Sequence, residues 1–210
     1  MAVNPEKVMA ARKMPFLEKM FEHAALLIPD GIGIVIGMRW IHGAKAERLA
    51  GADLMQRLCE ESADKGHKIF IYGSRESVNK KAVKILEKRY SGINIVGRSN
   101  GYVSQAQMTG LVEKINQSGA DILFVALGSP RQEEWIDRHL AKLNVKVCQG
   151  IGGTLDTIAG EVKRAPVLFQ KMNLEWFYRL VVDPKRIQRQ YLLPVFMMKM
   201  ILNGRSNMQA

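Results

Sequence analysis

The chain has 210 residues, of which 47% are hydrophobic, and it carries a formal net charge of +11. This length and apolar content are enough for one sizeable hydrophobic core, and they exclude a disordered or fibrous protein. The sequence contains no secretory signal and no run of about 20 apolar residues, so we expect no membrane-spanning helix. The positive charge favours an anionic partner, which would be lipid headgroups, a phosphorylated substrate or nucleic acid.

Short apolar runs alternate with segments of helical periodicity as far as Gly160. We expect strands at Ala25–Ile28, Lys68–Tyr72, Ile93–Val96, Asp121–Leu127 and Val145–Gln149. Helical spacing is followed by Val78, Ala82 and Leu86, and again by Met108, Leu111, Val112 and Ile115. The alternation predicts βαβ crossovers, and so an α/β fold with a mostly parallel, Rossmann-like sheet covered by helices on both faces.

The pattern changes after Gly160, where no further strand is predicted. We therefore expect an α/β domain over residues 1–160 and a C-terminal helical appendage over residues 161–210. Two helices are predicted in the appendage. The second begins at Asp183-Pro184, which suit the cap and the first helical position, and it ends near Asn203-Gly204. Pro194 is expected to kink this helix.

The appendage is both basic and apolar. Residues 163–210 hold nine Lys or Arg and two acids, which leaves a net charge of +7. A Met-rich helix that follows Arg186 and Arg189 fits three arrangements: packing on its own domain, an interface in a homo-oligomer, or a position in the surface of an anionic membrane. The tail is too apolar for a solvated nucleic-acid helix, so we expect no nucleic-acid partner.

Polar residues follow two predicted strands at the place where α/β sheets bind ligands. Asp30 ends the first predicted strand, and Gly31 after it allows a ligand to approach the backbone. Asp30 is either a general base or the cap of the next helix. The polar, basic turn Gly128–Trp135 follows the strand Asp121–Leu127, and it favours a phosphate-bearing ligand.

Two further features have a functional and a structural interpretation. The glycine-rich turn that contains Gly152 and Gly153 either offers its amides to a phosphate or sugar, or only permits close packing. Arg48 either contacts a diphosphate or is a solvated cation.

Several kinds of chemistry are not supported by the sequence. It contains no Asp-x-Asp pair, no G-x-x-x-x-G-K-[ST] phosphate loop and no G-x-S-x-G elbow, and its four histidines lack metal-ligand spacing. We expect Cys59 and Cys148 to be reduced core residues rather than a disulfide.

Six motifs occur in a characteristic order. They are Val-Asn-Pro-Glu, Pro-Asp-Gly-Ile-Gly, Glu-Arg-Leu-Ala-Gly-Ala-Asp, Gly-Ser-Pro-Arg-Gln-Glu, Gly-Ile-Gly-Gly-Thr-Leu-Asp and Ala-Gly-Glu-Val-Lys-Arg-Ala-Pro. From Asn4 to about Arg189, this series resembles the WecG/TagA/CpsF glycosyltransferase family.

The resemblance implies an inverting transfer of a sugar, often N-acetylmannosamine, from a UDP donor to undecaprenyl-diphosphate-linked N-acetylglucosamine. Such an enzyme needs no metal or other cofactor, lies peripherally on the cytoplasmic face of the bacterial membrane, and serves cell-surface polysaccharide or teichoic acid synthesis. The resemblance makes Asp30 the candidate general base. The implied substrate-binding residues are Asn4, Gly31, Arg48, Gln132, Gly152, Gly153 and the appendage arginines Arg179, Arg186 and Arg189.

The chain departs from the family at its beginning. Members usually have an additional strand and helix before a Thr-x-Asn motif, whereas this chain opens at Met1 with Ala2 where that Thr would stand. We expect either a truncated start or a shortened member, with an exposed sheet edge or pocket wall and one missing ligand contact. The rival hypothesis is an N-terminally truncated, non-catalytic protein that binds a UDP-sugar or a membrane surface.

Overall fold

A computed structural model describes residues 1–184, 187 and 191–207, without the side chains of residues 179 and 203–207. The chain forms two compact units. The sheet unit is Gly51–Lys163, and the terminal unit combines Met1–Ala50 with Arg164–Ala210. The expected division into an α/β domain over 1–160 and a helical appendage over 161–210 stays a prediction.

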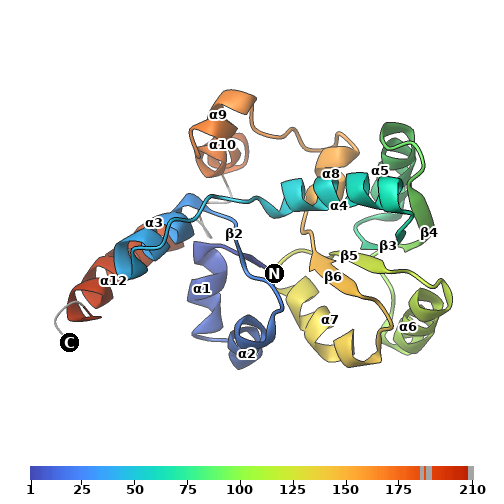
Figure 1. Ribbon diagram of the computed structural model, residues 1–210, viewed down its shortest axis with the longest axis horizontal. Coiled ribbons are helices and arrows are strands. Elements are labelled where there is room, and N and C mark those ends of the chain that lie inside the picture. The colour runs from blue at the N-terminus through green and yellow to red at the C-terminus, as the bar shows by residue number, and fades with distance from the viewer. Residues whose placement is uncertain (185–186, 188–190, 208–210) are drawn as a thin grey trace. The chain divides into compact units, whose positions relative to one another are not determined.

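The sheet unit is built around four strands in the order β4-β3-β5-β6, and every neighbouring pair is parallel (Figure 1). The strands are β3 (Lys68–Gly73), β4 (Asn94–Ser99), β5 (Ile122–Ala126) and β6 (Val147–Gly150). The helices are α4 (Gly51–Lys65), α5 (Glu76–Arg89), α6 (Met108–Gln117), α7 (Arg131–His139) and α8 (Thr154–Ile158), with short 3₁₀ turns at η1 (Gln105–Gln107) and η2 (Leu140–Lys142). This unit confirms the predicted α/β class and the two helices predicted from periodicity.

Alternate residues of the central strand β3 face the two helical layers. Ile69 and Ile71 belong to a buried cluster with residues of α4, α5 and α8. Tyr72 instead contacts Trp135 of α7, with ring centroids 4.9 Å apart. Figure 1 shows α4, α5 and α8 on one face of the sheet and α6 and α7 on the other. Because strands covered on both faces bury both sets of side chains, the sequence of such strands is nearly continuously apolar.

The terminal unit contains a separate pair of two-residue strands, β1 (Ala2–Val3) and β2 (Ile28–Pro29), which are parallel. Its helices are α1 (Pro5–Ala11), α2 (Pro15–His23), α3 (Ile32–His42), α9 (Val167–Lys171), α10 (Glu175–Val182) and α12 (Leu192–Asn207). The last helix contacts both α3 and α1, so the two ends of the chain share one unit.

The predicted strand Ala25–Ile28 is largely wrong. Only Ile28 is in a strand, and Leu26 and Leu27 are 60% and 44% exposed. The parallel ladder pairs Ile28 with Ala2 and Pro29 with Val3, and Ala25–Leu27 lie outside it. Apolar composition alone does not form a strand, because the backbone also needs a paired neighbour.

The long helix predicted from Asp183 to near Gly204 is described only in parts. Pro184 and Ile187 are helical, Tyr191 is in a turn, and α12 runs from Leu192 to Asn207, whereas 185–186 and 188–190 lie outside the described residues. Pro194 lies in the first turn of α12, where its missing N–H has no intrahelical acceptor to lose. The expected kink stays a prediction, and α9 is an additional short helix. Among the described residues, no helix is long and apolar enough to cross a membrane.

The closest approach between β3 and β5 generates a stability prediction. Gly73 has φ +122°, and a Cβ there would lie 2.4 Å from the carbonyl oxygen of Ala126. We expect Gly73→Ala to lower the free energy of unfolding by about 3 kcal/mol, because the clash involves backbone and the φ value disfavours a side chain. Urea denaturation measures this loss. The control Gly110→Ala lies on α6 with no atom within 4 Å of its added Cβ, and it should be neutral or slightly stabilising.

The two cysteines generate a second prediction. Both are free, as expected from the sequence, with Cys59 in α4 and Cys148 in β6. Burial raises the pKa of each thiol to about 12. Since the thiolate is the reactive form, alkylation of the folded protein at pH 8 should be about a thousandfold slower than that of the urea-unfolded protein. Cys59 is a core residue, as expected, whereas Cys148 is only partly buried. Equal rates would contradict the raised pKa of both thiols.

Candidate active site

The carboxyl ends of β3 and β5 form the point at which the strand order of the sheet reverses. From β3 the chain crosses to β4 on one side, and then returns to β5 on the other side. Ser74, with φ +58°, donates its N–H to Ala126, and its own carbonyl accepts from the N–H of Gly101, both at 2.8 Å. Ligands of open α/β sheets bind beyond this kind of edge. We therefore take the loops after β3, β4 and β5 as the candidate site in the sheet unit.

One buried amide ties these loops to α5. The Asn79 side chain has no exposed surface, and its Nδ2 donates to the carbonyls of Gly73 at 2.9 Å and Ser99 at 3.0 Å. The ends of β3 and β4 are thereby held by one side chain. Such a fixed edge is suited to receiving a ligand without rearrangement.

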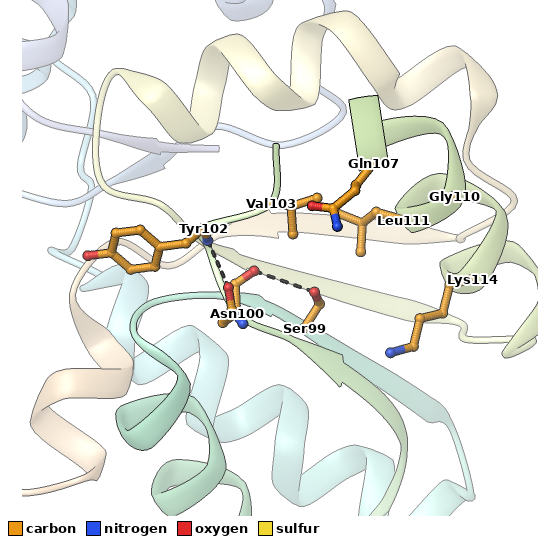
Figure 2. Close-up of a pocket in the computed structure, with 8 residues that line it drawn as sticks. All are labelled: Ser99, Asn100, Tyr102, Val103, Gln107, Gly110, Leu111 and Lys114. Atoms are coloured by element: carbon orange, nitrogen blue, oxygen red, sulfur yellow. Dashed lines mark hydrogen bonds between the residues drawn. The ribbon is translucent and has the colours of Figure 1, made fainter. Parts of the chain in front are cut away.

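A cavity of about 430 Å³ lies beside the end of β4 (Figure 2). Its lining residues are Ser99, Asn100, Tyr102, Val103, Gln107, Gly110, Leu111 and Lys114. The Oδ1 of Asn100 accepts from the N–H of Tyr102 at 2.9 Å, and the Tyr102 ring is 76% exposed. Figure 2 shows this ring pointing away from the other residues that line the cavity. The polar groups of the cavity are therefore amide and ammonium groups, and the Tyr102 ring is exposed beside it.

Sequence reasoning missed this cavity. Asn100 and Tyr102 belong to none of the six motifs, and the only local signal is a polar, glycine-containing loop after a predicted strand.

A second cavity of about 200 Å³ lies under the start of α7. Its lining includes Tyr72, Leu127, Arg131, Trp135 and His139. Burial raises the pKa of the Tyr72 hydroxyl, and the nearby Arg131 cation partly offsets that effect. Arg131 of the polar turn Gly128–Trp135 therefore lines a cavity.

Gln132 and the glycine-rich turn are brought together in the sheet unit. Gln132 is 3% exposed, and its Oε1 accepts the N–H of Gly152 at 2.8 Å. Its Nε2 donates to Glu133 at 2.8 Å, and a Cβ at Gly150 would lie 2.7 Å from that nitrogen. Gly153 follows as the residue before α8. Gln132 therefore joins two turns, and the missing side chain at Gly150 leaves room for it.

Asp30, Gly31 and Asn4 are brought together in the terminal unit. The N–H of Asp30 donates to Val3 at 2.8 Å, and a Cβ at Gly31 would lie 3.7 Å from that of Asn4. The Asn4 Oδ1 accepts from the N–H of Lys7 at 2.9 Å and caps α1. The N-cap residue of α3 is Gly31, so Asp30 stands one residue before the cap position.

Arg48 is not a solvated cation. Its Nη2 donates to Oε2 of Glu175 at 2.8 Å, and their side chains are 18% and 6% exposed. The other carboxylate oxygen of Glu175 lies 4.0 Å from Nε of Arg164. This pair joins residues 127 positions apart within the terminal unit. No local motif signals Glu175, so sequence reasoning missed it.

Comparison with known proteins decides the family. The profile described as "Glycosyl transferase WecG/TagA/CpsF family" matches residues 1–210. The chain belongs to this family. Its resemblance to the WecG/TagA/CpsF glycosyltransferases, first indicated by six motifs, is confirmed over the whole chain.

Three relatives share the name N-acetylglucosaminyldiphosphoundecaprenol N-acetyl-beta-D-mannosaminyltransferase. The protein of Bacillus spizizenii is 34% identical, covering 97% of this chain and 79% of the relative. That of Bacillus subtilis is 37% identical, covering 92% and 75%. That of Staphylococcus aureus (strain MRSA252) is 36% identical, covering 93% and 76%.

The appendage arginines of this WecG/TagA/CpsF family member stay a prediction. Arg179 lies in α10, but its side chain is outside the described part of the structure, as are Arg186 and Arg189 altogether. Within the described residues, no group of three or more His, Cys, Asp or Glu is arranged to hold a metal ion.

The buried position of Gln132 generates a prediction that separates its structural role from a role in substrate binding. We expect Gln132→Met to lower the free energy of unfolding by about 1–3 kcal/mol, because it leaves the N–H of Gly152 without its acceptor. Thermal and urea denaturation without any ligand measure this change. The control Gln117→Met, exposed on α6, should change stability by less than about 0.5 kcal/mol. Equal stabilities of the two variants would contradict the joining role of Gln132.

Proposed function

We propose that this family member transfers N-acetylmannosamine, or a related sugar, from a UDP donor to undecaprenyl-diphosphate-linked N-acetylglucosamine. The observation that carries the proposal is the shared name of relatives that are 34–37% identical over more than nine-tenths of this chain. The proposed transfer inverts the anomeric centre, uses no metal ion, and serves the synthesis of a cell-surface polysaccharide or teichoic acid.

The carboxyl edge of the sheet supports a nucleotide donor. A cavity of about 430 Å³ is within the usual range for small-molecule sites. Asn100, Gln107 and Lys114 of its lining offer polar contacts to a nucleoside. We assign the nucleoside part of the donor to this cavity.

Asp30 is the proposed general base. In an inverting transfer, the acceptor hydroxyl oxygen forms a bond to the anomeric carbon while the bond from that carbon to the diphosphate oxygen breaks. The hydroxyl proton passes to the base, and UDP leaves with the bonding electron pair. Asp30 is half-buried and directly precedes the Gly31 backbone, which lacks a side chain that would obstruct an acceptor.

Cationic and N–H groups are the proposed partners of the leaving diphosphate. Without a metal ion, the negative charge that develops on UDP requires preorganised donors. We assign this role to Arg48, Arg179, Arg186 and Arg189. The N–H of Gly152 is already donated to Gln132, so we propose only that Gly152 and Gly153 let a substrate approach the backbone of their turn. Asn4 and Gln132 are proposed to support substrate binding rather than charge neutralisation.

The proposed location is the cytoplasmic face of the bacterial membrane, with peripheral attachment. A polyprenyl-diphosphate acceptor resides in the bilayer, so the enzyme has to work at its surface. The charge of +7 over residues 163–210 favours anionic headgroups, and the apolar residues of α12 favour the interface.

Replacement of Asp30 tests the proposed chemistry. With UDP-N-acetylmannosamine and a lipid-diphosphate N-acetylglucosamine acceptor, Asp30→Asn should slow UDP release by about 10²–10⁴-fold, because the base is lost. UDP binding, measured by calorimetry, should remain. The control Asp64→Asn, exposed on α4, should keep wild-type turnover. Unchanged turnover in Asp30→Asn would remove Asp30 from the mechanism.

The wild-type protein separates the enzyme from its non-catalytic rival. Folded protein that binds UDP but releases none with any sugar donor would support the binding protein instead. Loss of turnover in a chelator, restored by Mg²⁺, would overturn the proposal that no metal is needed.

A further inference from the structure

Helix α3 is apolar on almost every side but only partly buried. Of its eleven residues, only Gly37 is fully buried, and Ile36 and Trp40 are exposed. Its large apolar residues are Ile32, Ile34, Val35, Ile36, Met38, Trp40 and Ile41. A helix that is hydrophobic all round belongs in a protein core or in lipid. The exposed part of α3 therefore lacks the apolar environment that its sequence favours.

Helix α12 is seated directly on α3 through two glycines. A Cβ at Gly33 would lie 3.7 Å from the Phe196 ring, and one at Gly37 would lie 2.9 Å from the Met200 sulfur. Gly33 and Gly37 are one turn apart, so they form a groove along one side of α3. The two helices lie side by side in Figure 1, and they form one apolar pair in the terminal unit.

Large apolar side chains of this helix pair face solvent. Ile36 and Trp40 follow each other by one turn on α3 and are 40% and 52% exposed. Met198 and Leu202 have the same spacing on α12 and are 60% and 62% exposed. Exposed large apolar side chains in this number on one helix pair indicate a site of interaction.

The charges of the helix pair identify its partner. Neither α3 nor α12 contains an acidic residue, whereas Arg39, Lys199 and Arg205 are cations. No acid follows Asp183 in the whole sequence. An apolar surface with only positive charges complements the interface of an anionic bilayer, and a second copy of the same basic surface would repel it.

We propose that α3 inserts together with α12 into the surface of an anionic bilayer, so that the membrane-binding surface includes α3 as well as the C-terminal tail. This inference rests on the membrane location in the proposed function and extends it to a segment far from the tail. Trp40 takes the interfacial position that indole rings prefer. Because α3 begins two residues after Asp30, its insertion holds the proposed base at the depth of the lipid-linked acceptor.

Vesicle binding by the whole chain tests the insertion of α3. With vesicles of phosphatidylglycerol and phosphatidylcholine, the double variant Ile36→Ser/Trp40→Ser should lose at least about tenfold in partition coefficient, since two large apolar side chains no longer leave water. Co-sedimentation measures the loss. Subtracting the emission spectrum of Trp40→Phe from that of the wild type isolates the fluorescence of Trp40. This fluorescence should shift to the blue on vesicle binding, and lipids with brominated acyl chains should quench it.

A matched variant controls for the general loss of apolar surface. Leu140 and Val147 of the sheet unit are 50% and 40% exposed, close to the values for the α3 pair. Leu140→Ser/Val147→Ser should bind vesicles as wild type does, and circular dichroism should show that both double variants are folded. Equal vesicle binding by the two double variants would overturn the proposal, as would Trp40 emission that vesicles leave unchanged.

Two measurements separate this inference from its alternatives. If Ile36→Ser/Trp40→Ser turns a dimer into a monomer in ultracentrifugation and keeps its vesicle binding, the surface covers a second copy and the proposal fails. Sugar transfer by the wild type to a short-chain, water-soluble acceptor tests the proposed function without a membrane. Failure of that transfer, with α3-dependent vesicle binding intact, would reject the proposed reaction and leave the insertion of α3 standing.

Discussion

The close contact between β3 and β5 at Gly73 is the constraint on which the carboxyl edge of the sheet depends. There the chain must leave two adjacent parallel strands in different directions, and only a residue without a side chain fits against the Ala126 carbonyl. Ser74 and Gly101 continue this edge through backbone hydrogen bonds, and the Asn79 amide fixes it from α5. The cavity beside Asn100 is therefore bordered by backbone whose position is set by several short contacts.

The buried interactions of Gln132 and Arg48 change how these two side chains are understood. Each was expected to meet substrate, and each already has a protein partner, Gly152 and Glu175 respectively. For Arg48, a protein partner does not exclude a ligand contact, because a guanidinium has five N–H donors and can serve two anions in different directions. Both polar atoms of the Gln132 side chain are already bonded within the protein. Glu175 then has the effect of fixing the direction of Arg48 before any diphosphate arrives.

The parts that were predictable from the sequence are those governed by local pattern. Lys68–Tyr72 and Asp121–Leu127 were recognised because strands buried on both faces are continuously apolar, and α5 and α6 were recognised from their periodic stripes. Ala25–Leu27 had a similar apolar composition, but a strand also requires a paired neighbour, which no local pattern reveals. The place of Pro194 in the first turn of α12 was not predicted, because proline can interrupt a helix or begin one.

The candidate site was predictable only where its residues stand in motifs. Asn4, Asp30 and Gly31 were named from sequence, and they do lie together. Glu175 and the cavity at Asn100 and Tyr102 were not named, because they arise from long-range pairing and from the space between a loop and a helix. Such features depend on tertiary structure, so the spacing of residues in the sequence does not predict them.

The pairing of Arg48 with Glu175 has a consequence for the order of events during synthesis. The sheet unit is continuous in sequence, so it can fold once Lys163 has left the ribosome. The terminal unit can fold only after its second half has been synthesised. Glu175 follows Arg48 by 127 residues, which take about 6 to 25 s at ordinary translation rates. During that interval α3 has been made and α12 has not. The newly made chain thus exposes an apolar, cationic segment before the tail is synthesised. We expect α3 to bind the membrane or a chaperone before α12 does.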